Sequence, residues 1–212
     1  MRVCTLLLLL VSQVTALNVV LPGGTGPLGQ ILASRLSHHD VTILTRNSFL
    51  AGAPNRVTNE FGWVGNTWLK KNRHVRLRDW DGGDLLDIVG SDWLGWQDDA
   101  LGSADVVVHL VGGYTEQRTM ACERIVRESL ILNPNALQVS VSPTEEELAS
   151  ISPGMATVKR ERLRKCEDLV KFNCPNAECL RLESFQLQKA CDEIQKVVDD
   201  WAAAVLVEPK VR

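Results

Sequence analysis

A glycine-rich turn between a short apolar strand and a helical stretch constrains the fold of this chain more than any other feature. The apolar strand is Leu17–Leu21, the turn is Pro22–Gly29, and the helical stretch is Gln30–Ser37. Asp40–Thr45 follows as a second strand rich in β-branched residues. A strand, a turn, a helix and a strand within about 30 residues form the smallest unit of a parallel sheet. The beginning of the chain therefore predicts an α/β protein.

Alternating strands and helices continue through the rest of the chain. We predict further strands at His74–Arg78, Ala104–Val111, Ala136–Ser142 and Glu178–Leu182. Helical patterns lie at Glu116–Leu132, Pro153–Phe172 and Leu187–Val207. The near-continuous apolar strands suit a sheet that is covered on both faces. The sequence thus predicts a doubly wound parallel α/β fold in one domain, residues 17–185, followed by a carboxy-terminal helix within residues 186–212.

The glycine pattern Gly-x-Gly-x-x-Gly occurs where a dinucleotide-binding turn requires it, after a strand and before a helix. In such turns Gly24 would allow the tight turn, Gly26 would let the backbone approach a pyrophosphate, and Gly29 would let the helix pack closely on the strand. The amide groups and the dipole at the helix start would favour the phosphates. The alternative is a tight strand-to-helix turn that binds no ligand.

The end of the second strand indicates which dinucleotide the turn would bind. An NAD site needs an acidic residue there to bind the ribose 2′-hydroxyl. This chain has Thr45, Arg46 and Asn47 instead, and the Arg46 guanidinium suits a 2′-phosphate. We therefore predict NADP as the cofactor over NAD. The alternative for Arg46 is a solvated loop cation.

Three segments resemble the extended or atypical short-chain dehydrogenase/reductases, a superfamily that includes sugar-nucleotide epimerases and dehydratases. They are Gly23–Gly29, Trp80–Asp81 and Asp105–Gly113. The resemblance implies a Rossmann-type fold, an adenine contact at Asp81, and a cofactor-facing segment after the fourth strand. The predicted cofactor-binding residues are Gly23, Gly24, Thr25, Gly26, Pro27, Leu28, Gly29, Thr45, Arg46, Asn47, Asp81, Leu110, Val111 and Gly112.

The catalytic pattern of that superfamily is incomplete here. Its members use a Tyr-x-x-x-Lys pair on the helix after the fifth strand, and a serine at the end of that strand. Lys159 and Ser142 match these positions, whereas Met155 stands where the tyrosine is expected. A thioether cannot exchange a proton, and the single tyrosine, Tyr114, lies elsewhere. Alternatives remain for the matching residues: Lys159 lies in a charged helix face and Ser142 precedes a proline as a helix cap would.

These observations leave three functional hypotheses open. The first is an NADP-binding protein without tyrosine-dependent catalysis that acts as a cofactor sensor, assembly factor or structural subunit. The second is an active oxidoreductase or isomerase of atypical mechanism, with Ser142, His109 or water handling the proton. The third is an interaction scaffold that binds no nucleotide. The partner, a small-molecule substrate or a protein, stays unidentified because only about 30 residues follow the last predicted strand.

Residues 1–16 have the layout of a secretory signal peptide. One basic residue, Arg2, precedes the apolar run Leu6–Val11, and the segment ends with the small residue Ala16. The run is shorter than the roughly 20 apolar residues of a membrane span, so we expect no stable span. Such a signal leads to the ER lumen or to an organelle reached through it, such as a complex plastid, more than to the exterior. The alternatives are an uncleaved anchor and a buried native element.

Composition and cysteine spacing exclude other classes of function. The net charge is −3, and the absence of a block of basic residues argues against nucleic-acid binding. The cysteines after the signal, odd in number, have no regular spacing and suggest buried free thiols, with a local Cys174–Cys179 bridge as the alternative. No histidine lies near them at metal-ligand spacing, so we predict no metal site.

Overall fold

The computed structural model describes residues 16–59, 62–82, 95–112, 115–150, 153–183 and 186–207. These residues form a six-stranded parallel sheet in the order β3-β2-β1-β4-β5-β6. The strands are β1 (Asn18–Pro22), β2 (Asp40–Thr45), β3 (Val75–Asp79), β4 (Val106–His109), β5 (Leu137–Pro143) and β6 (Ala177–Leu182). The strand order reverses between β1 and β4. In folds of this kind, ligands bind at such a switch point, outside the carboxyl ends of the strands. The topology confirms the predicted doubly wound fold.

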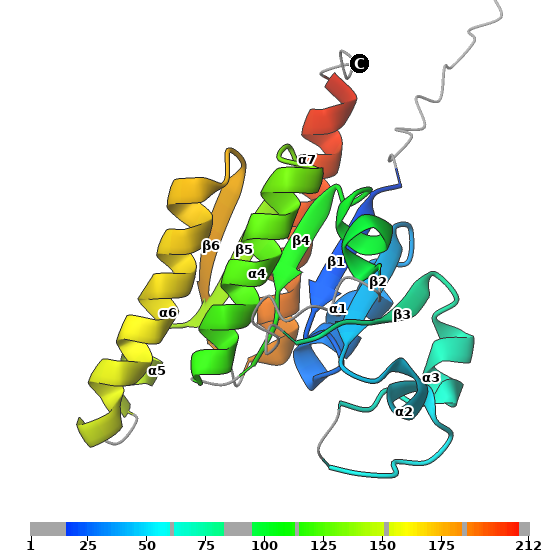
Figure 1. The fold of residues 1–212 in the computed structure, drawn as a ribbon, viewed down its shortest axis with the longest axis horizontal. Coiled ribbons are helices and arrows are strands. Elements are labelled where there is room, and N and C mark those ends of the chain that lie inside the picture. The colour runs from blue at the N-terminus through cyan, green and yellow to red at the C-terminus, as the bar shows by residue number, and fades with distance from the viewer. Residues whose placement is uncertain are drawn as a thin grey trace, which may run out of the picture.

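Helices cover both faces of the sheet. Figure 1 shows α4 and α6 in front of the strands, with α1 and α7 behind them. The long helices are α1 (Pro27–Arg35), α4 (Glu116–Leu132), α6 (Pro153–Asn173) and α7 (Leu187–Val207). Short helical elements lie in the connections: α2 (Ser48–Gly52), α3 (Asn66–Lys71), the π-helical turn η2 (Gln97–Leu101) and α5 (Glu145–Ser150).

Alternate residues of β1 and β4 belong to two cores, one on each face of the sheet. Val19 and Leu21 of β1 belong to the core under α1 and α7. Val20, between them, belongs to the opposite core together with residues of η2 and α4. In that core the Trp80 and Trp96 rings pack edge to face, with their centroids 5.6 Å apart. α7 shares the first core with β1, so this carboxy-terminal helix packs against the sheet.

The structure shifts several predicted boundaries by one to three residues. The first helix begins at Pro27 instead of Gln30 because proline, which lacks an amide hydrogen, is well tolerated at a first helical position. The fourth strand ends at His109, before the predicted Val111. There the chain leaves the sheet to pass Gly23, whose added Cβ would lie 2.7 Å from the Val111 backbone.

Two other predictions concern the cysteines and the amino terminus. Among the described residues, Cys122, Cys166, Cys174 and Cys191 are buried free thiols, and Cys179 is an exposed one. The alternative of a Cys174–Cys179 bridge is not formed. The predicted signal peptide lies, except for Ala16, outside the described residues. No helix in the described part of the chain has the length and apolar sequence that a membrane crossing needs.

Candidate dinucleotide site

A cavity of about 630 Å³ lies over the glycine turn at the carboxyl ends of β1, β2 and β4. Its volume is within the 300–1,000 Å³ or so of ordinary ligand pockets. Many of the predicted cofactor-binding residues line it: Gly23, Thr25, Gly26, Pro27, Thr45, Arg46, Leu110, Val111 and Gly112. Leu28 and Gly29 line an adjoining cavity. Gly24, Asn47 and Asp81 line neither.

Three of the four turn glycines are required by the fold itself. Gly23 has φ +77°, in the left-handed region. Gly24, which we expected to make the tight turn, is not among the positive-φ glycines; its constraint is the Leu21 side chain, 2.8 Å from an added Cβ. At Gly29 an added Cβ would lie 2.3 Å from the Gly24 carbonyl oxygen, so the close packing expected of this glycine is present. Gly26 differs, because an added Cβ there would meet nothing within 4 Å.

The start of α1 directs backbone amides at the turn. Gly26 is the N-cap residue, Pro27 occupies the first turn, and the Gln30 amide donates to the Gly26 carbonyl at 2.9 Å. The amides before Gln30 have no intrahelical acceptor, as in any helix start. No acidic residue occupies the first turn. The partial positive charge of the helix start is therefore not neutralised by a side chain of its own first turn, and it suits an anion.

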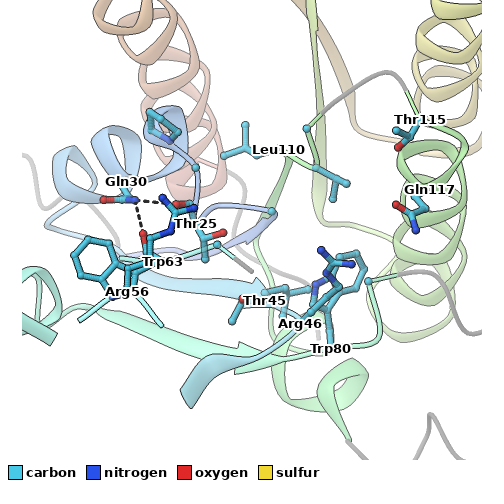
Figure 2. A pocket seen from close by; sticks show the side chains of 18 residues that line it. Thr25, Gln30, Thr45, Arg46, Arg56, Trp63, Trp80, Leu110, Thr115 and Gln117 are labelled. Atoms are coloured by element: carbon cyan, nitrogen blue, oxygen red, sulfur yellow. Dashed lines mark hydrogen bonds between the residues drawn. The ribbon is translucent and has the colours of Figure 1, made fainter. Parts of the chain in front are cut away.

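The long connection after β2 forms a wall of this cavity that the sequence did not predict. The Gln30 side-chain amide donates to the Thr25 carbonyl at 2.8 Å and to the Trp63 carbonyl at 3.1 Å, as Figure 2 shows. The Trp63 indole in turn donates to the Ala53 carbonyl at 2.8 Å. These bonds fasten the connection to the glycine turn. The sequence signals for this role are the length of the connection, residues 47–72, and its tryptophans, for which a ligand or partner surface is the alternative to core packing.

The cavity wall is basic. Arg46, at the end of β2, and Arg56, in the long connection, both line it, and its described lining contains no Asp or Glu. Asp79, the acid at the end of β3, accepts from the Ser48 amide at 2.5 Å and from the Ser48 hydroxyl at 2.8 Å. The sequence pointed to Arg46 alone. Arg56 has no local motif that would have identified it.

Asn47 and Asp81 have structural contacts in place of a position on the cavity wall. The Asn47 side chain accepts a hydrogen bond from the Leu50 amide at 2.8 Å and so caps α2. The Asp81 carboxylate is fully buried, 3.9 Å from the guanidinium of Arg124. The neighbouring Trp80 does line the cavity, opposite the glycine turn.

A second cavity of about 500 Å³ continues from the first on the other side of the glycine turn. The ends of β4, β5 and β6, the first turns of α4 and α7, and the start of α1 enclose it. Its described polar side chains are those of His109, Arg118 and Ser142. Its apolar side chains are Pro27, Leu28, Leu110, Val111, Val141, Pro143, Leu182, Leu187 and Ala190.

The predicted catalytic residues do not come together in either cavity. Ser142 lines the second one, but its hydroxyl donates to a carboxylate oxygen of Glu167. Burial acts to raise the pKa of Glu167, yet hydrogen bonds from Arg181 and Ser142 outweigh it and hold the pKa below its usual value. Lys159 lies on α6 eight residues before Glu167, about 12 Å along the helix axis, and is not among the lining residues. Met155 is also in α6, and Tyr114 lies outside the described residues.

His109 is a neutral core histidine. Its Nε2 bonds to the Gln138 side-chain oxygen at 2.9 Å, and the residue is only 7% exposed. Burial lowers its pKa to about 4. With Nε2 carrying the proton toward an oxygen acceptor, Nδ1 is the basic nitrogen of the ring.

A separate cluster of histidines lies at the opposite, amino-terminal ends of the strands. His38 Nε2 and His39 Nε2 are 3.8 and 3.6 Å from the Asp199 carboxylate. These residue types and distances are compatible with a metal ion. However, the Leu17 amide donates to His39 Nδ1 at 3.1 Å, so Nε2 carries the ring proton and points it at Asp199. A metal-bound histidine needs the reverse arrangement, with the second nitrogen donating. The cluster is therefore a structural contact between a neutral His39 and Asp199.

No protein-family model and no curated protein sequence matches the chain. A structure assigned as an NAD-dependent epimerase/dehydratase from Bacillus halodurans matches over 78% of this chain and 70% of its own, with 14% identity and a TM-score of 0.54. The chain has a Rossmann fold.

Two further Rossmann structures match at similar levels. One is an NADH-dependent reductase solved with NAD, at 12% identity over 75% of this chain and 72% of that one, with a TM-score of 0.53. The other is a short-chain dehydrogenase/reductase family oxidoreductase from Brucella ovis, solved with a partially ordered NAD. It matches at 14% identity over 87% of this chain and 92% of that one, with a TM-score of 0.52. Identities this low establish the fold that these proteins share with the chain.

Proposed function

We propose that this chain binds NADP(H) over its glycine turn and acts without the tyrosine-dependent chemistry of short-chain dehydrogenases. Its role would be that of a cofactor sensor, an assembly factor or a structural subunit. The observation that carries the cofactor choice is the charge of the larger cavity, which Arg46 and Arg56 line with no described acid. A 2′-phosphate needs such cations, whereas a free ribose 2′-hydroxyl needs a carboxylate acceptor.

The geometry of the turn supports phosphate binding. The first turn of α1 presents backbone amides to the cavity, and Gly26 has no side chain that would hold a ligand away from them. Thr45 and Leu110 line the two flanking walls, from the ends of β2 and β4. When bound, the cofactor would supply hydride chemistry. The residues of the chain would bind and orient it.

Three features support the absence of the usual proton relay. Met155 has no exchangeable proton, Ser142 commits its hydroxyl hydrogen to Glu167, and Lys159 lies away from both cavities. A serine that donates to a carboxylate cannot at the same time donate to a substrate carbonyl. Its contact links β5 to α6, which is a structural role.

Titration of the protein with NADPH, NADH and ATP tests the proposal, with tryptophan fluorescence as the readout because Trp80 lines the cavity. We expect NADPH to bind at least about tenfold more tightly than NADH, since the 2′-phosphate adds charge-assisted hydrogen bonds. The Arg46→Asp variant should lose that preference. Equal affinities for NADPH and NADH would refute the NADP assignment, and no binding of either would refute the proposal.

A further inference from the structure

The second cavity combines an apolar wall with a single described charge. We infer that it binds a small organic acid, a molecule with an apolar body and one carboxylate, and that Arg118 binds the carboxylate. The inference deepens the proposed function, because the cavity adjoins the dinucleotide cavity along Gly23, Gly26 and Leu110–Gly112. It names the class of molecule that would meet the cofactor there.

The apolar part of the wall comes from several elements that the fold brings together. Leu28 lies in α1, and Val141 and Pro143 lie at the end of β5. Leu182 is the last residue of β6, and Leu187 is the first residue of α7. No two of these elements are adjacent along the chain except β6 and α7. An aliphatic or aromatic body placed here removes apolar surface from water, both its own and that of the cavity wall, which favours binding.

Arg118 is held in place and still has donors to offer. One guanidinium nitrogen donates to the Val141 carbonyl at 2.5 Å, which fixes the side chain at the end of β5. The guanidinium also bonds the Cys166 sulfur. Because a guanidinium has five N–H donors in a planar fork, these two bonds leave others for a carboxylate. No ion pair joins Arg118 to another described residue. Arg118 acts electrostatically on the Glu167 carboxylate, which is itself bound by Arg181 at 2.8 Å.

The other two described polar side chains of this cavity, His109 and Ser142, carry no positive charge that would attract an anion. His109 is neutral above its pKa of about 4, and its Nε2 is bonded to Gln138. The Ser142 hydroxyl donates to Glu167. The positive charge of Arg118 is therefore not balanced from within the described lining, and a ligand carboxylate would balance it with a bidentate contact.

Calorimetric titration with matched acids and amides tests this inference. The probes are phenylacetate with phenylacetamide, and 4-methylpentanoate with 4-methylpentanamide, which differ in charge but hardly in shape. Acetate controls for the need of an apolar body. We expect each larger acid to bind at least about tenfold more tightly than its amide, and more tightly than acetate. Arg118→Met should abolish the preference for the acid.

Two further variants make the test specific. Arg127→Met removes an exposed arginine of the same helix that pairs with Glu128, and it should leave the preference unchanged. Arg118→Lys keeps the charge and loses the planar fork, so it should weaken acid binding several-fold while keeping some preference. Arg118→Lys also serves if Arg118→Met does not fold: unchanged acid affinity in that variant would overturn the inference.

The outcomes for the acid and for the dinucleotide are separable. Acids that bind no better than their amides, or that do not bind at up to about 10 mM, overturn the inference even if NADPH binds. A preference that persists in folded Arg118→Met also overturns it. Acid binding that depends on Arg118 in a protein that binds no NADPH would support the inference and refute the proposed function.

Discussion

Replacing Gly29 by alanine is the sharpest test of how the glycine turn is built. The new methyl carbon would lie 2.3 Å from the Gly24 carbonyl oxygen and 2.5 Å from the Gly24 Cα atom. Ordinary contact needs about 3.4 Å, so α1 and the turn would have to separate by about 1 Å. Both partners are backbone, and rotating a side chain cannot relieve the clash.

The expected cost follows from two opposing effects. Overpacking costs about 1–3 kcal/mol, and the upper end applies because the neighbour is backbone. Alanine recovers about 1 kcal/mol over glycine inside a helix. The net loss is therefore about 2 kcal/mol in the free energy of unfolding, which corresponds to a decrease of about 4–8 °C in Tm for a chain of this size.

Urea denaturation and thermal melting followed by tryptophan fluorescence measure this loss, since Trp80 and Trp96 are 4% and 0% exposed in one core. Gly26→Ala is the matched control, because its added Cβ meets nothing within 4 Å and should change stability by less than about 0.5 kcal/mol. If Gly29→Ala is as stable as the wild type, or if both variants lose the same stability, the described packing of the turn is wrong.

Other predictions address charge, proton linkage and thiol reactivity. Arg56→Asp should weaken NADPH binding by at least about tenfold and leave NADH within about threefold, measured by the same fluorescence titration. His109 has a folded pKa of about 4, below the ordinary 6.5, so the unfolded chain binds more protons between these values. Stability should be full above pH 6.5 and fall by up to about 3 kcal/mol toward pH 4. The difference from His109→Gln isolates this slope from that of His39, whose pKa is also lowered by burial. Among the described cysteines, iodoacetamide should label exposed Cys179 first, which peptide mass spectrometry of the native protein would show; labelling of buried Cys191 at an equal rate would contradict the burial.

The sequence predicts the elements of this fold well where side-chain patterns are local. The helices Glu116–Leu132 and Leu187–Val207 have the bounds that their patterns predict. The strands are displaced by at most two residues, because strand ends depend on backbone partners in neighbouring strands. The Thr-x-x-Glu pattern at residues 144–147 is typical of a capping box, and the Thr144 hydroxyl accepts from the Glu147 amide at 3.3 Å at the start of α5.

The site was less predictable where residues meet across the chain. Arg56 and Trp63 reach the cavity through a connection whose path has no sequence signature. Asp81 belongs to the Trp80–Asp81 segment that the resemblance identifies, yet its carboxylate lies 3.9 Å from the guanidinium of Arg124, on a helix distant in the sequence. The sequence does not mark Arg118 as a binding residue, since its position beside Val141 depends on the packing of α4 against the end of β5. Such contacts arise from tertiary packing, which local patterns do not encode.

Gly26 distinguishes a ligand site from a scaffold that only keeps the fold. Gly23, Gly24 and Gly29 would each place a Cβ within 3 Å of other atoms, so the fold requires them whether or not a ligand binds. Gly26 has φ −73° and open space, which any residue could occupy. Under the proposed function, its lack of a side chain lets a ligand approach the backbone. Gly26→Val should leave the melting temperature nearly unchanged and weaken NADPH binding by at least about tenfold, measured by fluorescence titration. A Gly26→Val protein that binds NADPH as the wild type does would remove this argument and favour the scaffold.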